Sequence, residues 1–171
     1  NKLYSTFTTS ITHGEPQVGN VALISQSGAF GSHCFVLGRE RGLGFSGCVT
    51  TGNEVDITVA ECMAYFAMDD DTDVLACYME GCKDGEQFKA ALELAQERGK
   101  PVVIQKVGRS AVGSEAAASH TASLTGADKV YDAVFERYNA YRADTTSELI
   151  DIAYMVSGMR KYGKLPTGNK I

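Results

Sequence analysis

Hydrophobic runs of strand length alternate with amphipathic, helix-like stretches along most of the chain. The runs fall at residues 20–25, 45–51, 73–79, 101–107 and 140–143. Largely apolar runs of this length are typical of strands buried on both faces of a parallel sheet. Between the runs and after the last, apolar residues recur every three or four positions, the spacing of a helix that buries one side. The pattern therefore predicts strands and helices in regular alternation.

Helix boundaries are marked by residues that cap free backbone groups. Thr58 and Thr145 are each followed three residues later by a glutamate, the spacing of a capping box, and Asp84 is followed by a glutamine at the same distance. The helix after Asp84 is expected to end at Gly99 and Pro101. Strands that alternate with helices favour a parallel sheet with crossover helices. We expect an α/β fold, a flavodoxin-like three-layer sandwich with a five-stranded parallel sheet in the order 2-1-3-4-5.

One connection is much longer than the others. Residues 108–125 separate the fourth strand from the next helix by roughly eighteen residues, whereas connections in α/β units usually have about two to six. The segment is rich in Ala, Ser, Gly and Thr and contains a single histidine. The helix that follows is predicted to bury Val130, Val134 and Tyr138. Because connections of this length are usually functional or disordered, the segment is a candidate for chemistry.

The composition suits a single domain and shows no basic patch that would bind a polyanion. The chain has 171 residues, 44% of them hydrophobic, and a net charge of −5, which suits one core and one domain. No Lys/Arg cluster forms a basic stripe, so neither a nucleic-acid partner nor a membrane partner is expected. No apolar run approaches the ~18 residues of a membrane span, and we expect a cytoplasmic protein.

The cysteines and the acidic residues give no sign of a metal site. The cysteines are odd in number and form no CxxC pair, so we expect reduced core residues. Residues 69–71 with Asp73 form an acidic cluster, but it precedes a strand and is interpreted as a solvated loop. The cysteines are Cys34, Cys48, Cys62, Cys77 and Cys82.

The turn after the first strand is a candidate anion site. Residues 25–31 read SQSGAFG and lie where a strand ends and a helix begins, so their N–H groups point outward from the positive end of a helix. Phosphate suits such a turn. The alternative is an ordinary tight turn with Ser27 as the helix N-cap. The glycine spacing matches neither a dinucleotide-binding fingerprint nor a P-loop.

Two further candidates lie at the same edge of the predicted sheet. His120 sits in the long connection among small polar residues, and Glu80 directly follows the third strand. A carboxylate there is placed to accept the N–H of an imidazole and to raise the nucleophilicity of its other nitrogen. In the order 2-1-3-4-5, Ser27, Glu80 and the His120 segment all emerge at the carboxyl edge, where open α/β sheets bind ligands. The alternative is an exposed histidine and a solvated acid without roles.

These motifs together resemble a known family. Five places carry the resemblance: the stretch PQVGNVALISQSGAFG beginning at Pro16, the turn at 51–56, Glu80 at a strand end, the GKPV entry at 99–102, and SHTA at 119–122 with Gly126. In these places the chain resembles the NDP-forming acyl-CoA synthetases of the ADP-forming acetyl-CoA synthetase type. The second domain of the succinyl-CoA synthetase alpha subunit is similar. The chain departs from the family pattern at Ala122, where a glycine is expected, and this makes the backbone there less permissive.

The resemblance implies roles for the candidate residues. His120 is expected to carry the phosphoryl group as phosphohistidine, and Glu80 to hold the histidine. The residues implied to receive the phosphate are Ser27, Gly28, Ala29, Phe30 and Gly31.

It also implies a reaction and partners. The parent enzyme would interconvert acyl-CoA, phosphate and ADP or GDP with the free acid, CoA and ATP or GTP in the presence of Mg, through an acyl phosphate. Residues 1–15 resemble the tail of a preceding CoA-binding domain or linker, 16–162 the flavodoxin domain, and 163–171 the start of a following domain. CoA-binding and ATP-grasp domains are therefore the expected partners, and a homo-oligomer is compatible with this. The chain itself is expected to bind nothing beyond phosphate and not to complete the reaction alone.

Two other functions remain open at this point. Ser27, Glu80 and His120 follow the order of an α/β-hydrolase triad, although Ser25 and Ala29 stand where that motif has glycines. A non-catalytic module that regulates a fused protein acetyltransferase is the third interpretation. The domain next to this one in the complete protein would discriminate between them.

Overall fold

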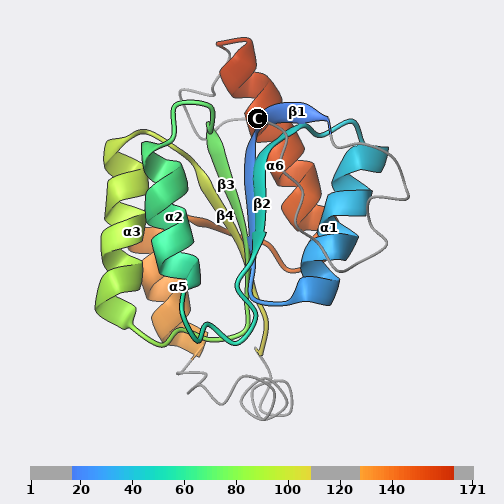
Figure 1. The fold of residues 1–171 in the computed structure, drawn as a ribbon. Helices are drawn as coiled ribbons and strands as arrows, with labels where there is room; N and C mark the ends of the chain where they lie inside the picture. Colours follow the sequence, from blue (N-terminus) through green and yellow to red (C-terminus); the bar gives the residue numbers. More distant parts are fainter. Residues whose placement is uncertain (1–16, 109–127, 164–171) are drawn as a thin grey trace.

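The computed structural model describes residues 17–108 and 128–163, which form one α/β unit around a central sheet (Figure 1). In chain order the elements are β1 (Val18–Ser25), α1 (Gly28–Glu40), β2 (Phe45–Thr50), α2 (Val59–Met68), β3 (Val74–Met79), α3 (Gly85–Glu97), β4 (Val102–Lys106), α5 (Asp128–Arg137), β5 (Tyr141–Arg142) and α6 (Thr146–Lys161).

The sheet has five parallel strands in the order β2-β1-β3-β4-β5, which confirms the predicted fold and strand order. The register pairs Ser25 at the end of β1 with Tyr78 near the end of β3, and Met79 with Lys106 at the end of β4. All six residues of β3 are buried, as expected of a central strand covered on both faces. The carboxyl ends of β1, β3 and β4 therefore meet at one edge.

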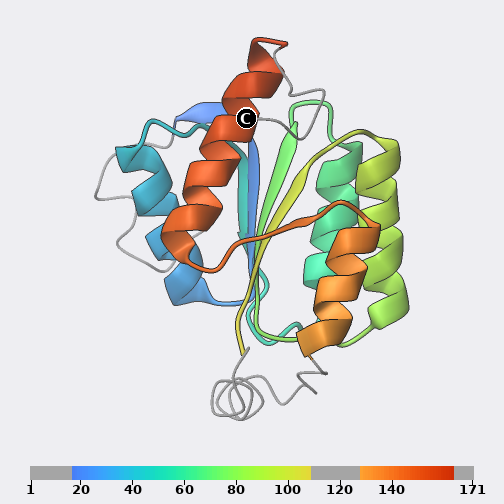
Figure 2. The same cartoon turned by 180° about the vertical axis from the view of Figure 1, so that it is seen from behind.

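Helices cover both faces of the sheet, and the two hydrophobic cores lie between the layers (Figures 1 and 2). Helices α2, α3 and α5 pack on one face over Ile24, Cys77 and Ile104. Helices α1 and α6 pack on the other face over Leu23 and Ala76. Neighbouring strand residues alternate between the two cores because successive side chains of a strand point to opposite faces.

The predicted caps form as hydrogen bonds. Thr58 and Glu61 make a complete capping box at the start of α2. Asp84 accepts from two backbone N–H groups at the start of α3, and Thr145 accepts from the N–H of Glu148. Each bond satisfies a backbone donor that the first turn of a helix otherwise leaves free.

Two predictions about the core are wrong. Val130 is exposed, and α5 instead buries Tyr131 and Phe135, with Val134 and Tyr138 half-buried. Among the cysteines, Cys48 is exposed, because it lies on the edge strand β2.

The other four cysteines are buried or half-buried, and all five are free. Within 17–108 and 128–163, no helix is long and apolar enough to span a membrane. The segments expected to belong to neighbouring domains, 1–15 and 163–171, fall outside the described residues apart from Gly163.

Candidate functional site

The turn between β1 and α1 is held by its own serines. The Ser25 hydroxyl donates to the carbonyl of Ser27 at 2.7 Å and accepts the N–H of Ser27 at 3.1 Å. Ser27 is the N-cap of α1: its hydroxyl accepts the N–H of Phe30 at 3.3 Å, and its carbonyl accepts the N–H of Gly31 at 2.8 Å. The turn is therefore fixed before any ligand arrives.

These contacts reduce the number of backbone N–H groups that are available to bind a phosphate at this turn. Of the five residues named for it, Ser27, Phe30 and Gly31 have their N–H groups engaged within the turn. The N–H groups of Gly28 and Ala29 have no acceptor among the described residues, as expected for the first two positions of a helix. They lie at the positive end of the helix dipole, so an anion at this turn would bind to these two groups.

Gly31 packs closely against the ends of two strands. A Cβ atom at this position would lie 2.7 Å from the Cγ2 of Thr50 and 3.2 Å from the Cβ of Ser25. The glycine therefore allows α1 to approach the ends of β1 and β2 closely.

Gln26 ties this turn to the end of β3. Its side-chain oxygen accepts the N–H of Glu80 at 2.5 Å and that of Gly81 at 3.0 Å, and its amide donates to the carbonyl of Gly81 at 2.8 Å. The backbone N–H of Gln26 also donates to the carbonyl of Tyr78 at 3.1 Å. One buried glutamine therefore fixes the backbone that carries Glu80.

Glu80 lies at the carboxyl edge as predicted, but it is buried rather than a solvated loop acid. Burial, and after it the negative charge of Glu80, raises the pKa of Tyr78. The Tyr78 ring in turn stacks on Phe30, with 4.2 Å between ring centroids. The structure therefore brings Glu80 and the start of α1 together through Gln26, Tyr78 and Phe30.

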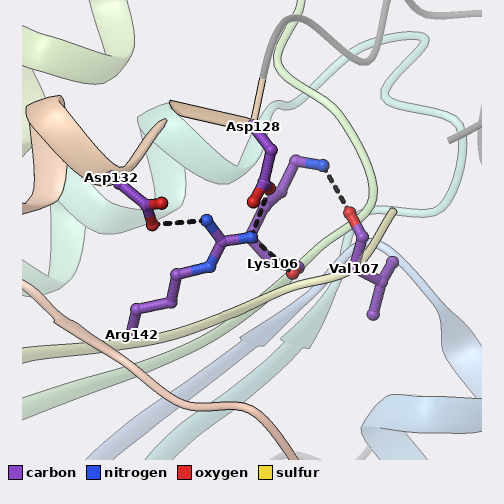
Figure 3. A network of polar contacts seen from close by, with 5 residues as sticks. All are labelled: Lys106, Val107, Asp128, Asp132 and Arg142. Carbon is purple, nitrogen blue, oxygen red and sulfur yellow. Dashed lines mark hydrogen bonds and ion pairs between the residues drawn. The ribbon is translucent and has the colours of Figure 1, made fainter. Parts of the chain in front are cut away.

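His120 lies outside the described residues, so the structure does not test its proximity to Glu80. The described chain stops at Gly108, just after β4, and resumes at Asp128, the first residue of α5. Val107, directly before Gly108, and Asp128 both belong to one polar cluster (Figure 3).

Arg142 is the centre of that cluster (Figure 3). Its guanidinium pairs with Asp128 at 2.5 Å and Asp132 at 2.6 Å, and it donates to the carbonyl of Lys106 at 3.3 Å. A single side chain on β5 therefore joins the end of β4 to the first turn of α5, on either side of the segment that contains His120.

Lys106 is a buried cation beside this cluster. Its ammonium donates to the carbonyl of Val107 at 2.5 Å and lies 4.7 Å from the centroid of the Tyr131 ring. Burial, followed by the charge of Arg142, lowers the pKa of Lys106. The ammonium is therefore held in a place that disfavours its charge.

The turn at residues 51–56 is anchored by two charged side chains. The Glu54 carboxylate accepts the N–H of Val59 at 2.7 Å, which adds a cap to α2. Lys83 donates to the carbonyls of Asn53 and Glu54 at 2.6 and 2.9 Å. The contacts described for this motif are therefore structural.

The acidic cluster lies at the amino edge, before β3 and opposite Glu80, as expected. Asp69 accepts the hydroxyl of Thr72 at 2.6 Å, and Asp73 accepts the side-chain amide of Asn20 at 2.7 Å. No group of three or more His, Cys, Asp and Glu side chains that could hold a metal occurs in the part of the chain that the structure describes.

The backbone at Ser27 bears on the hydrolase alternative. Its φ and ψ are −110° and 124°, an ordinary extended conformation, and its hydroxyl caps the helix. A nucleophile elbow instead places its serine on a sharp, strained turn with a free hydroxyl. The geometry of this turn favours anion binding over nucleophilic attack by Ser27.

Sequence reasoning missed three of the residues that shape this edge: Gln26, Tyr78 and Arg142. The position of Gln26 at the end of a strand, directly before a candidate N-cap, is a usable signal. Tyr78 lies inside an apolar run and Arg142 inside a very short strand, and neither sequence context marks its contact.

Comparisons with known proteins show the family to which the chain belongs. Residues 18–156 match a family model described as the succinyl-CoA ligase like flavodoxin domain. The chain is 39% identical over 150 residues to the ADP-forming acetate–CoA ligase I of Archaeoglobus fulgidus, covering 88% of this chain and 22% of that protein. It is 43% identical over 143 residues to the alpha subunit of ADP-forming acetate–CoA ligase I of Pyrococcus furiosus, covering 82% of this chain and 30% of that subunit.

A solved structure shares the fold. It is acetyl-coenzyme A synthetase 1 of Ca. Korarchaeum cryptofilum, described as dinucleotide forming and in complex with phosphate and ADP. The TM-score is 0.77 at 32% identity, over 84% of this chain and 31% of that one. The chain thus spans less than a third of the length of each of these relatives.

Proposed function

This chain belongs to the succinyl-CoA ligase-like flavodoxin domain family, and from that premise we propose that it is the phosphohistidine-carrying domain of an NDP-forming acyl-CoA synthetase. The observation that carries the proposal is the pairing, at one sheet edge, of Glu80, a buried residue whose backbone Gln26 holds, with a helix start whose first two N–H groups have no acceptor among the described residues. Sequence similarity to ADP-forming acetate–CoA ligases supports the same assignment.

The proposed chemistry uses His120 as the nucleophile. A ring nitrogen of neutral His120 attacks the phosphorus of an acyl phosphate, the bond from phosphorus to the acyl oxygen breaks, and the free acid leaves. Glu80 stabilises the positive charge that develops on the ring. The N–H groups of Gly28 and Ala29 bind the oxygens of the phosphoryl group at the start of α1.

The phosphoryl group then leaves the histidine. A terminal oxygen of ADP or GDP attacks the phosphorus, the bond to the ring nitrogen breaks, and ATP or GTP is released. The length of the segment that carries His120 suits movement between two sites. CoA, Mg, the CoA-binding domain and the ATP-grasp domain belong to the complete enzyme in this proposal, which we place in the cytoplasm.

A labelling experiment on the complete protein tests the proposal. Incubation with γ-labelled ATP and Mg should give a protein label that is labile in acid and stable in base, as expected of phosphohistidine. His120→Ala should abolish the label, whereas His33→Ala, at an exposed position on α1, should leave it unchanged. Esterase activity that Ser27→Ala removes, in a protein that takes no label, would favour the hydrolase instead.

A further inference from the structure

A groove lies at the amino edge of the sheet, opposite the edge that carries Glu80. It forms where the first residues of β1, the turn between α1 and β2, and the last turns of α6 come together (Figure 1). Its volume is about 490 Å³, within the range of about 300–1,000 Å³ that is usual for pockets that bind small molecules. The proposed phosphoryl chemistry makes no use of this groove.

One wall of the groove is a stripe of α6. Tyr154, Ser157, Gly158, Lys161 and Tyr162 line it, at the spacing of three or four residues that places side chains on one face of a helix. The two tyrosines are 51% and 72% exposed, and the ammonium of Lys161 lies 5.9 Å from the centroid of the Tyr162 ring. Exposed aromatic rings are platforms on which a planar ring stacks. This wall therefore offers stacking and a positive charge.

Gly158 keeps the middle of this wall open. A glycine inside a helix is destabilising relative to alanine, so its presence in α6 calls for a reason. The packing of the domain does not supply one, because a Cβ atom at this position would meet nothing within 4 Å. What the glycine provides is bare helix backbone between the two tyrosines, where a planar ligand can lie against the helix.

The floor of the groove holds a fixed hydrogen-bond donor and acceptor. The side-chain amide of Asn20 donates to one oxygen of Asp73 at 2.7 Å and accepts the hydroxyl of Ser157 at 2.5 Å. The backbone N–H of Asp73 donates to the carbonyl of Asn20 at 2.8 Å, which keeps the two residues side by side. The second N–H of the Asn20 amide and the second oxygen of Asp73 have no partner among the described residues. They are therefore available to a ligand.

We propose that this groove binds a purine nucleotide. The edge of a purine base carries a donor beside an acceptor, which matches the carboxylate oxygen of Asp73 and the N–H of Asn20. The planar base stacks on Tyr154 over Gly158, and the ammonium of Lys161 pairs with the phosphate. This inference is independent of the proposed function, because the groove and the candidate phosphate turn lie at opposite edges of the sheet.

The test is a calorimetric titration of the 171-residue chain with AMP and with GMP. This chain is preferable to the complete protein, because the ATP-grasp domain of our proposal would bind nucleotide as well. We expect saturable binding of at least one of the two nucleotides. Ribose 5-phosphate, which has no base to stack, should bind roughly tenfold more weakly or worse. Coenzyme A also carries an adenosine phosphate and is titrated in parallel; the tighter ligand identifies whether free nucleotide or coenzyme A is the source.

Variants of α6 locate the bound nucleotide. Gly158→Leu fills the groove from the helix, so nucleotide affinity should fall roughly tenfold or more. Because leucine favours a helix more than glycine does, this variant should unfold at a Tm no lower than that of wild type. Tyr154→Ala should also weaken binding roughly tenfold, since it removes a stacking platform. Tyr65→Ala is the matched control, because it removes a 70% exposed tyrosine from α2 and should bind as wild type does.

Three results overturn the inference. The first is the absence of binding of either nucleotide at roughly millimolar concentration. The second is an unchanged nucleotide affinity in Gly158→Leu. The third is an affinity that is lost in Gly28→Pro and kept in Gly158→Leu, which would place the nucleotide at the start of α1. Each of these results leaves the proposed function intact, because the labelling experiment tests that function separately.

Discussion

Replacing Arg142 with methionine removes the guanidinium that joins β4, β5 and the start of α5, while the apolar stem is largely kept. The Arg142 side chain is 8% exposed, whereas its partners Asp128 and Asp132 are 27% and 51% exposed. Breaking a fully buried ion pair costs about 3–5 kcal/mol, and an exposed pair contributes about 0–1 kcal/mol. Because the two carboxylates regain water, we expect an intermediate loss of about 2 kcal/mol.

The assay is urea denaturation of the 171-residue chain, with thermal unfolding as a second measurement. A loss of this size corresponds to a fall of about 4–8 °C in Tm for a domain of this length. Arg41 is the matched control, since it pairs with Asp151 at 2.7 Å, but its side chain is 31% exposed and that of Asp151 is 59% exposed. Arg41→Met should cost less than about 1 kcal/mol.

The comparison of the two arginines decides whether burial of the guanidinium matters. Equal losses in the two variants would refute the reasoning, because exposure would then not set the contribution of the pair. An Arg142→Met chain as stable as wild type would mean that the cluster does not hold α5 against the sheet.

Two other variants test single features of the carboxyl edge. Gly28→Pro removes one of the two N–H groups of α1 that have no acceptor among the described residues and leaves the extended N-cap undisturbed, so the phosphate affinity measured by calorimetry on the 171-residue chain should fall roughly tenfold. Gly85→Pro makes the same change at the first position of α3 and should leave the phosphate affinity unchanged. Equal affinities in the two variants would contradict the site. Lys106→Met should raise the free energy of unfolding at pH 7 by about 1 kcal/mol, because it removes a buried charge whose bonds are to a carbonyl and a ring. The lowered pKa of Lys106 means that the folded state releases this proton first, so the advantage of the variant should shrink as pH rises toward about 10.4, the unfolded value; a constant difference across this range would refute it.

The sequence was sufficient to predict the sheet because its evidence is redundant. Unbroken apolar runs, capping residues and turn glycines all indicate the same alternation of strands and helices, and the strand order follows from how such units pack. Placing Glu80 at the carboxyl edge needed only that order.

Helix α5 shows where periodicity alone fails. Val130 and Val134 have the same spacing as Tyr131 and Phe135, one residue further on, so two adjacent faces compete for the core. The aromatic pair bury more apolar surface. The contacts of Asp128 and Asp132 with Arg142, fourteen and ten residues away, fix the helix rotation and are invisible in a local pattern.

The partners of Glu80 were beyond prediction for a related reason. Gln26 contacts its backbone because β1 and β3 are adjacent and in register. A buried tyrosine in an apolar run is ordinarily a core residue, and only the three-dimensional neighbourhood shows that Tyr78 stacks on Phe30 and that the charge of Glu80 helps to raise its pKa.

The central claim is that His120 carries the phosphoryl group, and locating that group on the sequence tests it most directly. The complete protein would be phosphorylated with an acyl phosphate, digested at neutral to alkaline pH and sequenced by tandem mass spectrometry under conditions that preserve phosphohistidine. We predict one phosphorylated peptide with the modification on His120, and loss of the modification when ADP or GDP is added before digestion. Phosphorylation on Ser27 or on another residue, or a His120 that stays unmodified while the acyl phosphate is consumed, would contradict the account.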